Sequence, residues 1–292
     1  MPSARLALEY SNEPQSFWHY LDPIAMVRSL WSHRHLTLQF ASRNIQALYK
    51  GQALGLIWAL LDPLVTLAIY TFVFGVIFYR GQTSDSAAVG GLAGYALRVY
   101  TGILVFGIFQ QTVGAAPTLI VSQPNFVKKV VCPLETFPVT QLLVTLWNFS
   151  VGLIVWLIGY CIFDPSHLPN LRMLLLPIVI LPVALLGLGL SWILSSLGVF
   201  IRDLRNPVAN ILHMMFFLTP IFYTLDSIPE KFRSVIAINP LASLVESSRA
   251  VMFATGWPDW KLWGITLIAS IVLCVFGYAF FMKSRRAFAD VI

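Results

Sequence analysis

The sequence predicts an all-α integral membrane protein with six transmembrane helices, and three observations carry the prediction. Of the 292 residues, 58% are hydrophobic and only 11% are charged, whereas soluble proteins contain about 25% charged residues. Mean hydropathy is +0.76. The apolar residues also gather into runs that are long enough to cross a bilayer.

Six of these apolar runs qualify as spanning helices. They cover residues 53–79, 99–121, 139–163, 173–200, 208–225 and 262–282. Because the number is even, both termini lie on the same side of the membrane. That side then holds 12 of the 19 lysines and arginines, and the other side holds 7. Cytoplasmic loops are enriched in Lys and Arg, so we predict that both termini are cytoplasmic.

The segment before the first span is expected to lie along the membrane surface. Residues 1–22 are interpreted as an N-terminal tail and residues 23–52 as an amphipathic interface helix that starts at Asp22-Pro23, a capping residue followed by a first-turn proline. Polar residues interrupt an apolar stripe on this helix, as in helices that lie in the interface plane. The stripe consists of Ile24, Val27, Leu30, Trp31 and Leu38.

Residues 53–292 form the six-span domain, and two of its connections are expected to be structured. In the cytoplasmic segment 122–135, a short helix is predicted from Ser122 to Pro133, with apolar and basic side chains on opposite faces. The apolar face has Phe126, Val127, Val130 and Val131, and the basic face has Lys128 and Lys129.

The external segment 226–257 contains two apolar stretches that are too short to span, and we interpret them as re-entrant helices. Ser227-Ile228-Pro229-Glu230 is a capping box that starts the first, and Asn239-Pro240 starts the second. Glu246 and Arg249 lie three residues apart on the second helix and are predicted to form an ion pair.

Two short patterns inside the spans bear on packing. Asp62 precedes Pro63, and we expect it to cap a helix that begins at the proline rather than to carry protons. Gly187, Ser191 and Ser195 recur every four residues, which predicts close approach of helix backbones.

The chain lacks the usual motifs of catalysis and nucleotide binding. It has no G-x-x-x-x-G-K-[ST] phosphate loop, no H-E-x-x-H, no Cys-x-x-Cys and no G-x-S-x-G motif. Cys132, Cys161 and Cys274 have neither disulfide nor metal-site spacing. The chain is therefore predicted not to be an enzyme by itself and to hold no metal.

Several motifs in a fixed order resemble the permease subunits of bacterial ABC transporters that export lipid-linked polysaccharide, such as O-antigen, capsule and teichoic acid. The resemblance covers roughly residues 25–285. It is carried by the Tyr49–Trp58 run with Asp62-Pro63, by Asn125–Lys129 with Pro133-Leu134-Glu135, by Arg202-Asp203-Leu204, by Phe217–Tyr223, by Ile228–Lys231, by Asn239-Pro240-Leu241 and by Arg249.

The resemblance implies a homodimer of permease domains (residues 53–292) in the bacterial inner membrane. Two copies of a cytoplasmic ABC ATPase would bind ATP and Mg, and the cargo would be a lipid-linked glycan of O-antigen or lipopolysaccharide biosynthesis, with no nucleic acid involved. The segment 122–135 would couple the ATPase to the spans. Its candidate residues are Asn125, Phe126, Val127, Lys128, Lys129, Pro133 and Glu135.

Aromatic residues are the candidates for the cargo path, since sugar rings pack their C–H faces on aromatic rings. Tyr70, Phe74 and Phe78 recur every four residues and form one stripe of the first span. Further candidates are Phe72, Tyr79, Phe216, Phe222 and Tyr223. Ordinary helix packing and an interfacial aromatic belt are the competing interpretations. Arg28, Arg43 and Lys50 are candidates for attracting a pyrophosphate head group, or they anchor the chain to the membrane surface.

Three other functions remain open on the sequence. A permease of the same architecture would export a drug or a lipid. A membrane glycosyltransferase or acyltransferase would normally show acidic or histidine clusters at a membrane face, and a proton-driven transporter would bury a chain of acids. A neighbouring gene with a phosphate-loop motif would favour ATP-driven export.

Overall fold

The computed structural model describes residues 20–50, 55–70, 72–73, 91–128, 132–163, 170–223, 229–231 and 239–292. Over these residues the protein is helical and has no β-strand. Four helices are long and apolar enough to cross a membrane: Ala93–Thr118, Thr136–Ile162, Leu171–Phe200 and Trp260–Val291. The predicted all-α membrane class is confirmed.

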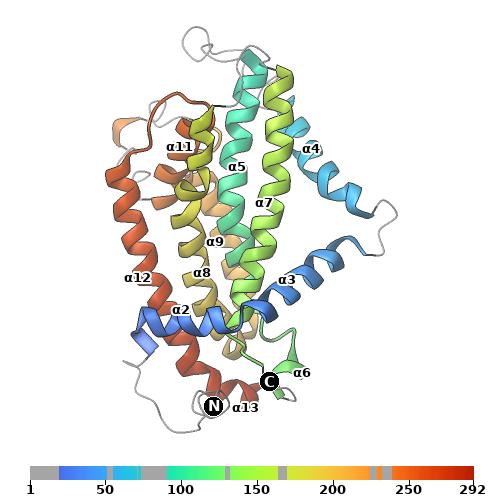
Figure 1. Ribbon diagram of the computed structural model, residues 1–292, viewed down its shortest axis with the longest axis vertical. Coiled ribbons are helices and arrows are strands. Elements are labelled where there is room, and N and C mark those ends of the chain that lie inside the picture. Colours follow the sequence, from blue (N-terminus) through green and yellow to red (C-terminus); the bar gives the residue numbers. More distant parts are fainter. Residues whose placement is uncertain are drawn as a thin grey trace.

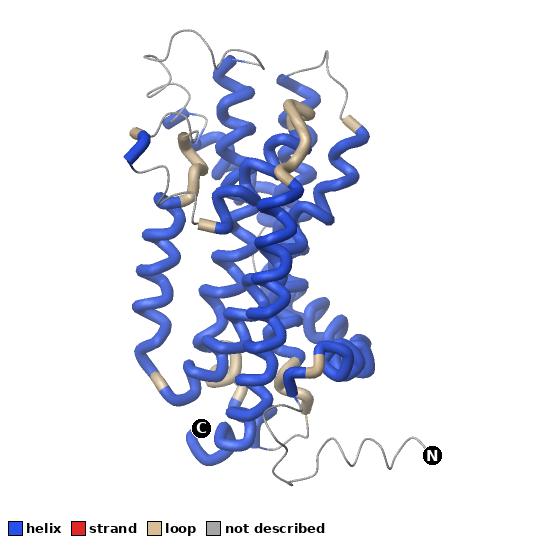
Figure 2. The backbone as a smooth tube through the Cα atoms, turned by 90° about the vertical axis from the view of Figure 1, so that its left-hand side faces the viewer, coloured by secondary structure: helices blue, strands red, loops and turns tan. Residues whose placement is uncertain are grey.

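The four long helices form an upright bundle (Figures 1 and 2). They are α5 (Gly91–Ala115), α7 (Thr136–Phe163), α8 (Leu176–Phe200) and α12 (Trp260–Ser284). In the bundle α8 packs on α12, and α5 packs on both α7 and α8. Trp156 of α7 and Trp192 of α8 are fully buried at its centre. We call the end of the bundle that carries α6 (Pro124–Lys128) and α13 (Phe288–Val291) the lower end, as in Figure 1.

Two helices, rather than the single one predicted for residues 23–50, lie across the bundle toward its lower end (Figure 1). These are α2 (Pro23–Ser32) and α3 (Arg34–Tyr49). The predicted cap is confirmed, because the Asp22 carboxylate accepts a bond from the Ile24 amide. The continuous helix is wrong, because the Ser32 hydroxyl and the His33 ring both bond the Ser29 carbonyl, and such local bonds compete with the helical ladder. Ile24, Val27, Trp31 and Leu38 are all exposed.

The first apolar run contains α4 (Trp58–Tyr70), which packs on α7 and α5 at the side of the bundle (Figure 1). A 3-10 turn, Gly55–Ile57, precedes it, and Gly55 has a φ of 51°, which glycine adopts without strain. The cap predicted at Asp62 is wrong, because Pro63 lies inside α4 rather than at its start. Because Pro63 lies beyond the first turn, it removes the i→i−4 bond to the carbonyl of Ala59.

The fifth apolar run forms a shorter helix than predicted. α9 spans Arg205–Leu218, whereas the prediction extended to residue 225. Thr219 is extended, with φ −86° and ψ 135°. Pro220 follows it, and the residue before a proline is disfavoured in the helical conformation. The helix therefore ends before the proline.

The backbones of α8 and α12 lie in direct contact. A Cβ added at Gly189 would lie 2.8 Å from the Cys274 backbone nitrogen, and one added at Gly277 would strike the carbonyl oxygen of Gly189. The predicted face of small residues is present too, since Gly187, Ser191 and Ser195 are buried on α8. Gly187 faces Thr112 of α5 at ordinary contact distance. The direct contact between α8 and α12 thus uses glycines outside the predicted repeat.

Replacing Gly277 with alanine is expected to lower the melting temperature of the detergent-purified protein. The added methyl group meets backbone rather than a flexible side chain, and overpacking of this kind costs about 1–3 kcal/mol. Gly264→Ala on the same helix is the matched control, because nothing lies within 4 Å of its added Cβ. Equal melting temperatures for the two variants would contradict the contact.

Candidate functional site

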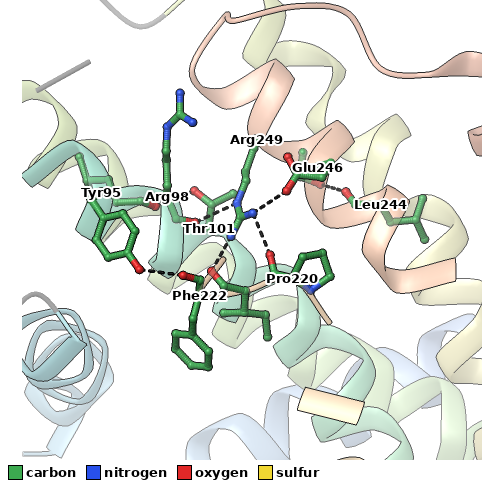
Figure 3. A network of polar contacts seen from close by, with 11 residues as sticks. Tyr95, Arg98, Thr101, Pro220, Phe222, Leu244, Glu246 and Arg249 are labelled. Carbon is green, nitrogen blue, oxygen red and sulfur yellow. Dashed lines mark hydrogen bonds and ion pairs between the residues drawn. The ribbon is translucent and has the colours of Figure 1, made fainter. Parts of the chain in front are cut away.

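Arg249 is the centre of a buried polar network that joins three segments of the chain (Figure 3). It lies on α11 (Pro240–Met252) and is 7% exposed. Its guanidinium donates to the carbonyl oxygens of Arg98 at 3.2 Å, Pro220 at 2.8 Å and Ile221 at 2.6 Å. A fourth bond of 2.7 Å reaches Glu246 Oε1, which confirms the predicted ion pair.

The buried Arg249 guanidinium is surrounded by hydrogen-bond acceptors and one counter-charge. Burial lowers the pKa of the Arg249 guanidinium, and the Glu246 carboxylate opposes that change. Three carbonyl oxygens accept from the same fork of N–H groups, which suits the planar guanidinium better than an ammonium. The network therefore ties α11 to α5 and to the turn at residues 219–223.

Local sequence explains why these segments meet. The predicted start of α11 is confirmed, because the Asn239 side chain accepts from the Leu241 amide and Pro240 occupies the first turn. The same side chain donates to the Thr219 hydroxyl at 2.9 Å. Gly102 of α5 makes room, since a Cβ there would lie 3.1 Å from Arg249 and 3.3 Å from the Ile221 backbone.

An aromatic cluster lies beside this network, between α4, α5 and the end of α9. We define it as Tyr70, Phe106, Phe216, Phe217 and Phe222. The ring centroid of Phe222 lies 5.7 Å from that of Tyr70 and 5.3 Å from that of Phe216. Phe106 continues the cluster, 5.4 Å from Phe216. The Tyr95 hydroxyl donates to the Phe222 carbonyl at 2.7 Å, so the backbone that carries the ring is held in place (Figure 3).

The structure brings together three of the aromatic residues suggested for the cargo path, namely Tyr70, Phe216 and Phe222. Tyr223 is close by and donates to the Phe217 carbonyl at 3.0 Å. Phe72 is 59% exposed. The other candidates, Phe74, Phe78 and Tyr79, lie outside the described residues.

The helices on either side of the cluster expose further apolar side chains. On α4 these include Leu64, Val65 and Ile69, and on α9 they include Ile211, Met214 and Phe217. Aromatic rings in this setting present flat apolar faces, and a tyrosine hydroxyl adds a hydrogen-bonding group at the edge. Such a surface can contact sugar rings without holding a charge.

The segment suggested for ATPase coupling begins with α6, which is five residues long. Phe126 packs inward, with its ring 5.6 Å from Phe40 of α3 and 5.9 Å from Phe137 of α7. Val127 is partly buried against the same core. Asn125 and Lys128 are exposed. The remaining residues of the predicted helix, Lys129, Val130 and Val131, lie outside the described part.

The end of this segment is anchored inside the protein. Pro133 and Glu135 are buried. The Glu135 carboxylate pairs with Arg285 at 2.7 Å, with side-chain exposures of 4% and 20%. The backbone carbonyl oxygen of Glu135 accepts a hydrogen bond from the Trp192 indole N–H at 3.0 Å. Glu135 thus connects the coupling segment to α8 and to the lower end of α12, a role its sequence context did not indicate.

The three basic residues suggested for a head-group entrance are exposed but do not form one site. Arg28 lies on α2, whereas Arg43 and Lys50 lie toward the far end of α3, beyond the break at His33. The Arg43 guanidinium lies over the Phe40 ring, 5.2 Å from its centroid. Its charge therefore sits next to α6.

The described residues include possible metal ligands and three cysteines. Among them, no group of three or more His, Cys, Asp and Glu side chains is placed to hold a metal ion. Cys132 and Cys274 are buried and Cys161 is exposed. Burial raises the pKa of the Cys132 thiol, and the nearby Glu135 carboxylate raises it further, so this thiol is a poor nucleophile.

Comparison with known proteins places this helical arrangement in a family. Residues 35–253 match the family described as ABC-2 type transporter. The chain belongs to the ABC-2 transporter membrane family. Members of an ABC transporter family use ATP hydrolysis, and the permease subunit is the part that lies in the membrane.

Relatives of this ABC-2 chain come from several bacteria. An O-antigen export system permease protein RfbA of Myxococcus xanthus is 28% identical over 271 residues, covering 92% of this chain and all of the relative. An RfbA protein of Klebsiella pneumoniae is 28% identical over 258 residues, which is 88% of this chain and 95% of the relative. The polysialic acid transport protein KpsM of Escherichia coli is 28% identical over 233 residues, which is 78% of this chain and 85% of the relative.

Proposed function

We propose that this chain is the channel-forming permease of an ATP-driven exporter that moves a lipid-linked polysaccharide from the cytoplasmic to the outer face of the bacterial inner membrane. It acts as a homodimer with two copies of a cytoplasmic ATPase, which bind ATP and Mg. The observation that carries the proposal is the near full-length similarity to permeases named for O-antigen export and to a polysialic acid transporter. The aromatic cluster, which suits a sugar chain, supports it further.

The proposed membrane arrangement assigns six spans. Four are the long helices α5, α7, α8 and α12, and the other two are the apolar runs that contain α4 and α9. The lower end faces the cytoplasm, as the distribution of Lys and Arg favours. Then α2 and α3 lie in the cytoplasmic interface with their apolar stripe toward lipid, and α11 is the second outer re-entrant helix. In this proposal residues 1–22 are an N-terminal tail. Residues 23–52 are the interface segment, and residues 53–292 are the permease domain.

The cargo path in this proposal runs along α4 and α9, whose exposed apolar faces meet those of a second copy. The aromatic cluster lines it, with Phe72, Phe74, Phe78, Tyr79 and Tyr223 as further wall residues. Aromatic contacts bind a sugar ring weakly, and a transport path needs sites weak enough to release the cargo. At the entrance, Arg28, Arg43 and Lys50 attract the pyrophosphate of the lipid carrier toward the interface.

Replacing Tyr70 with leucine is expected to reduce polysaccharide export several-fold while the protein level and basal ATP hydrolysis stay normal. Leucine keeps the side chain apolar but removes the ring that contacts Phe222. Export is measured as polysaccharide reaching the cell surface after a pulse of labelled sugar. Phe276→Leu is the control, because Phe276 is a half-exposed ring on α12, away from α4 and α9. Equal export by both variants would remove Tyr70 from the path.

Coupling to the ATPase is proposed to use the exposed part of segment 122–135. ATP binding closes the ATPase dimer, and a short rigid element must carry that motion to the spans. Asn125 and Lys128 supply the contact surface, while Phe126 and Val127 hold α6 against α3 and α7. Pro133 and Glu135 then pass the motion into the bundle through Trp192 and Arg285.

Reversing the charge of Lys128 is therefore expected to uncouple the two subunits. A like-charge contact at a matched interface costs several kcal/mol, so Lys128→Glu should lower export about tenfold and weaken copurification with the ATPase. Lys261→Glu makes the same change at the opposite end of the molecule, on α12, and should leave both unchanged. If Lys128→Glu copurified and exported normally, α6 would not be the contact.

The direct test of the function is deletion of the gene in its host. We expect surface polysaccharide to disappear and lipid-linked polysaccharide to accumulate inside the cell, with rescue by the wild-type chain together with its ATPase. A deletion strain that keeps its surface polysaccharide but changes in drug resistance or lipid distribution would overturn the proposed cargo.

A further inference from the structure

A second feature of the membrane domain is a cavity of about 450 Å³ between α4, α5 and α7. It is separate from the aromatic cluster, since none of the five cluster residues lines it. On α4, Trp58, Asp62 and Thr66 line the cavity at intervals of four residues, so one face of this helix forms a wall. The half-exposed Trp58 ring places that wall at the surface of the subunit.

Two buried hydroxyl groups give this cavity its chemical character. Tyr100 of α5 and Thr145 of α7 both line it, and each is 1% exposed. Within the described part of the chain, neither hydroxyl has a hydrogen-bond partner. A hydroxyl buried without a partner costs about 1–3 kcal/mol, and a ligand or water in the adjoining cavity would supply the missing partner.

The amide groups of the same wall are held in position. The Asn148 side chain on α7 donates to Gln111 Oε1 on α5 at 2.8 Å, so the two amides meet across the helix interface. Gly152 keeps the neighbouring space open, because a Cβ there would run into Leu104 and lie 3.2 Å from the Tyr100 hydroxyl. The Gln111 and Asn148 amides thus line the cavity at fixed places, and the wall also contains the two buried hydroxyls.

The lining distinguishes between classes of ligand. It combines one carboxylate, that of Asp62, with amides, hydroxyls and the rings of Trp58 and Phe149, and no Lys, Arg or His is among the described lining residues. A phosphate or carboxylate ligand would meet the Asp62 charge without a compensating cation. A neutral polyhydroxyl ring suits the site, because its hydroxyl groups both donate and accept and its C–H face packs on an aromatic ring.

We propose that this cavity binds one neutral sugar residue of the exported polysaccharide. The inference rests on the proposed function and deepens it by assigning a polar sugar site that is distinct from the aromatic cluster. Tyr100 and Thr145 bond the sugar hydroxyls, the Gln111–Asn148 pair orients them, and Trp58 packs on the ring. The site holds the chain by hydrogen bonds before it meets the aromatic cluster, where contacts are apolar.

Photo-crosslinking in the intact transporter tests occupancy. The photoreactive residue p-benzoylphenylalanine is placed at Trp58, which is 37% exposed and lines the cavity, or at Trp147, which is 40% exposed on α7 and does not. After irradiation of exporting cells, the purified chain is probed with antiserum against the host polysaccharide. We expect polysaccharide on the Trp58 variant alone. Its absence there, or equal labelling at both positions, overturns the proposal.

Removing single hydroxyls provides the second measurement. Tyr100→Phe and Thr145→Val should each slow export about threefold, as expected for one lost hydrogen bond, with a melting temperature that is unchanged or higher. Ser270→Ala is the matched control, because that buried hydroxyl also has no partner among the described residues but lies on α12. Unchanged export in both cavity variants overturns the proposal, as does an equal loss in the control.

The two hypotheses fail in different ways. If gene deletion leaves surface polysaccharide intact, the proposed function itself is wrong. If deletion abolishes surface polysaccharide while neither the crosslink nor the hydroxyl variants behave as expected, only the sugar site is wrong.

Discussion

Replacing Arg249 with methionine is expected to prevent stable folding of most of the protein. The variant leaves the carbonyl oxygens of Arg98, Pro220 and Ile221 without their donor and Glu246 without its counter-charge. Breaking a fully buried ion pair costs about 3–5 kcal/mol, and this pair contributes less because the Glu246 side chain is 37% exposed and screened by solvent. The loss should appear as a much lower yield of monodisperse protein in mild detergent and a strongly reduced melting temperature.

Two further variants separate hydrogen-bond geometry from charge. Arg249→Lys keeps the charge but replaces the planar fork with a single ammonium group, so its stability should lie between those of wild type and Arg249→Met. Arg98→Met removes a nearby guanidinium but keeps the Arg98 carbonyl that Arg249 bonds, and should cost much less. A wild-type melting temperature for Arg249→Met would refute the role of the network.

Replacing Glu135 with leucine is expected to uncouple ATP hydrolysis from export and also to destabilise the protein. It removes the carboxylate that connects the end of the coupling segment to Arg285, and a charge-assisted bond of this kind contributes about 1.5–3 kcal/mol. Because Arg285 is 20% exposed, solvent screens part of that energy. We expect a modest fall in melting temperature but a large fall in the export rate per ATP hydrolysed by the reconstituted transporter.

A double-mutant cycle isolates this pair from other effects of the substitution. Glu135→Leu, Arg285→Leu and the double variant should show a coupling energy of about 1–2 kcal/mol in stability. Glu230→Leu serves as the control, because this exposed glutamate lies in the segment between α9 and α11. Additive effects of the two pair mutations would show that the contact does not contribute.

The sequence predicted the features that depend on local chemistry. The helix starts at Asp22-Pro23 and Asn239-Pro240 and the Glu246–Arg249 pair involve residues that are at most three apart, so spacing was enough to find them. The bounds of the long spans also agree within a few residues, because apolar runs set them, apart from α5, which both starts and ends earlier than predicted. The number of spans, the re-entrant helices and the roles of the site residues stay predictions.

The features that were missed depend on contacts between distant segments or on weak local bonds. Three acceptors of Arg249 are backbone carbonyls, and the spacing of side chains contains no information about them. Glu135 looked like part of a surface loop, yet Trp192 and Arg285 bury it. The break at His33 arises from side-chain bonds to Ser29, and the position of Pro63 inside α4 departs from the usual preference of proline for the first turn.

The contact between Gly189 and Gly277 decides which parts of the subunit can move. Helices separated by a layer of side chains can slide when those side chains change rotamer, but two backbones in direct contact have no such layer. We therefore expect α8 and α12 to move together, and Glu135 connects the coupling segment to Trp192 of α8 and to Arg285, directly after α12. If the proposed path runs along α4 and α9, we expect these helices to move when it widens, because their faces are largely exposed. We therefore expect the transport cycle to displace α4 and α9 relative to the pair of α8 and α12.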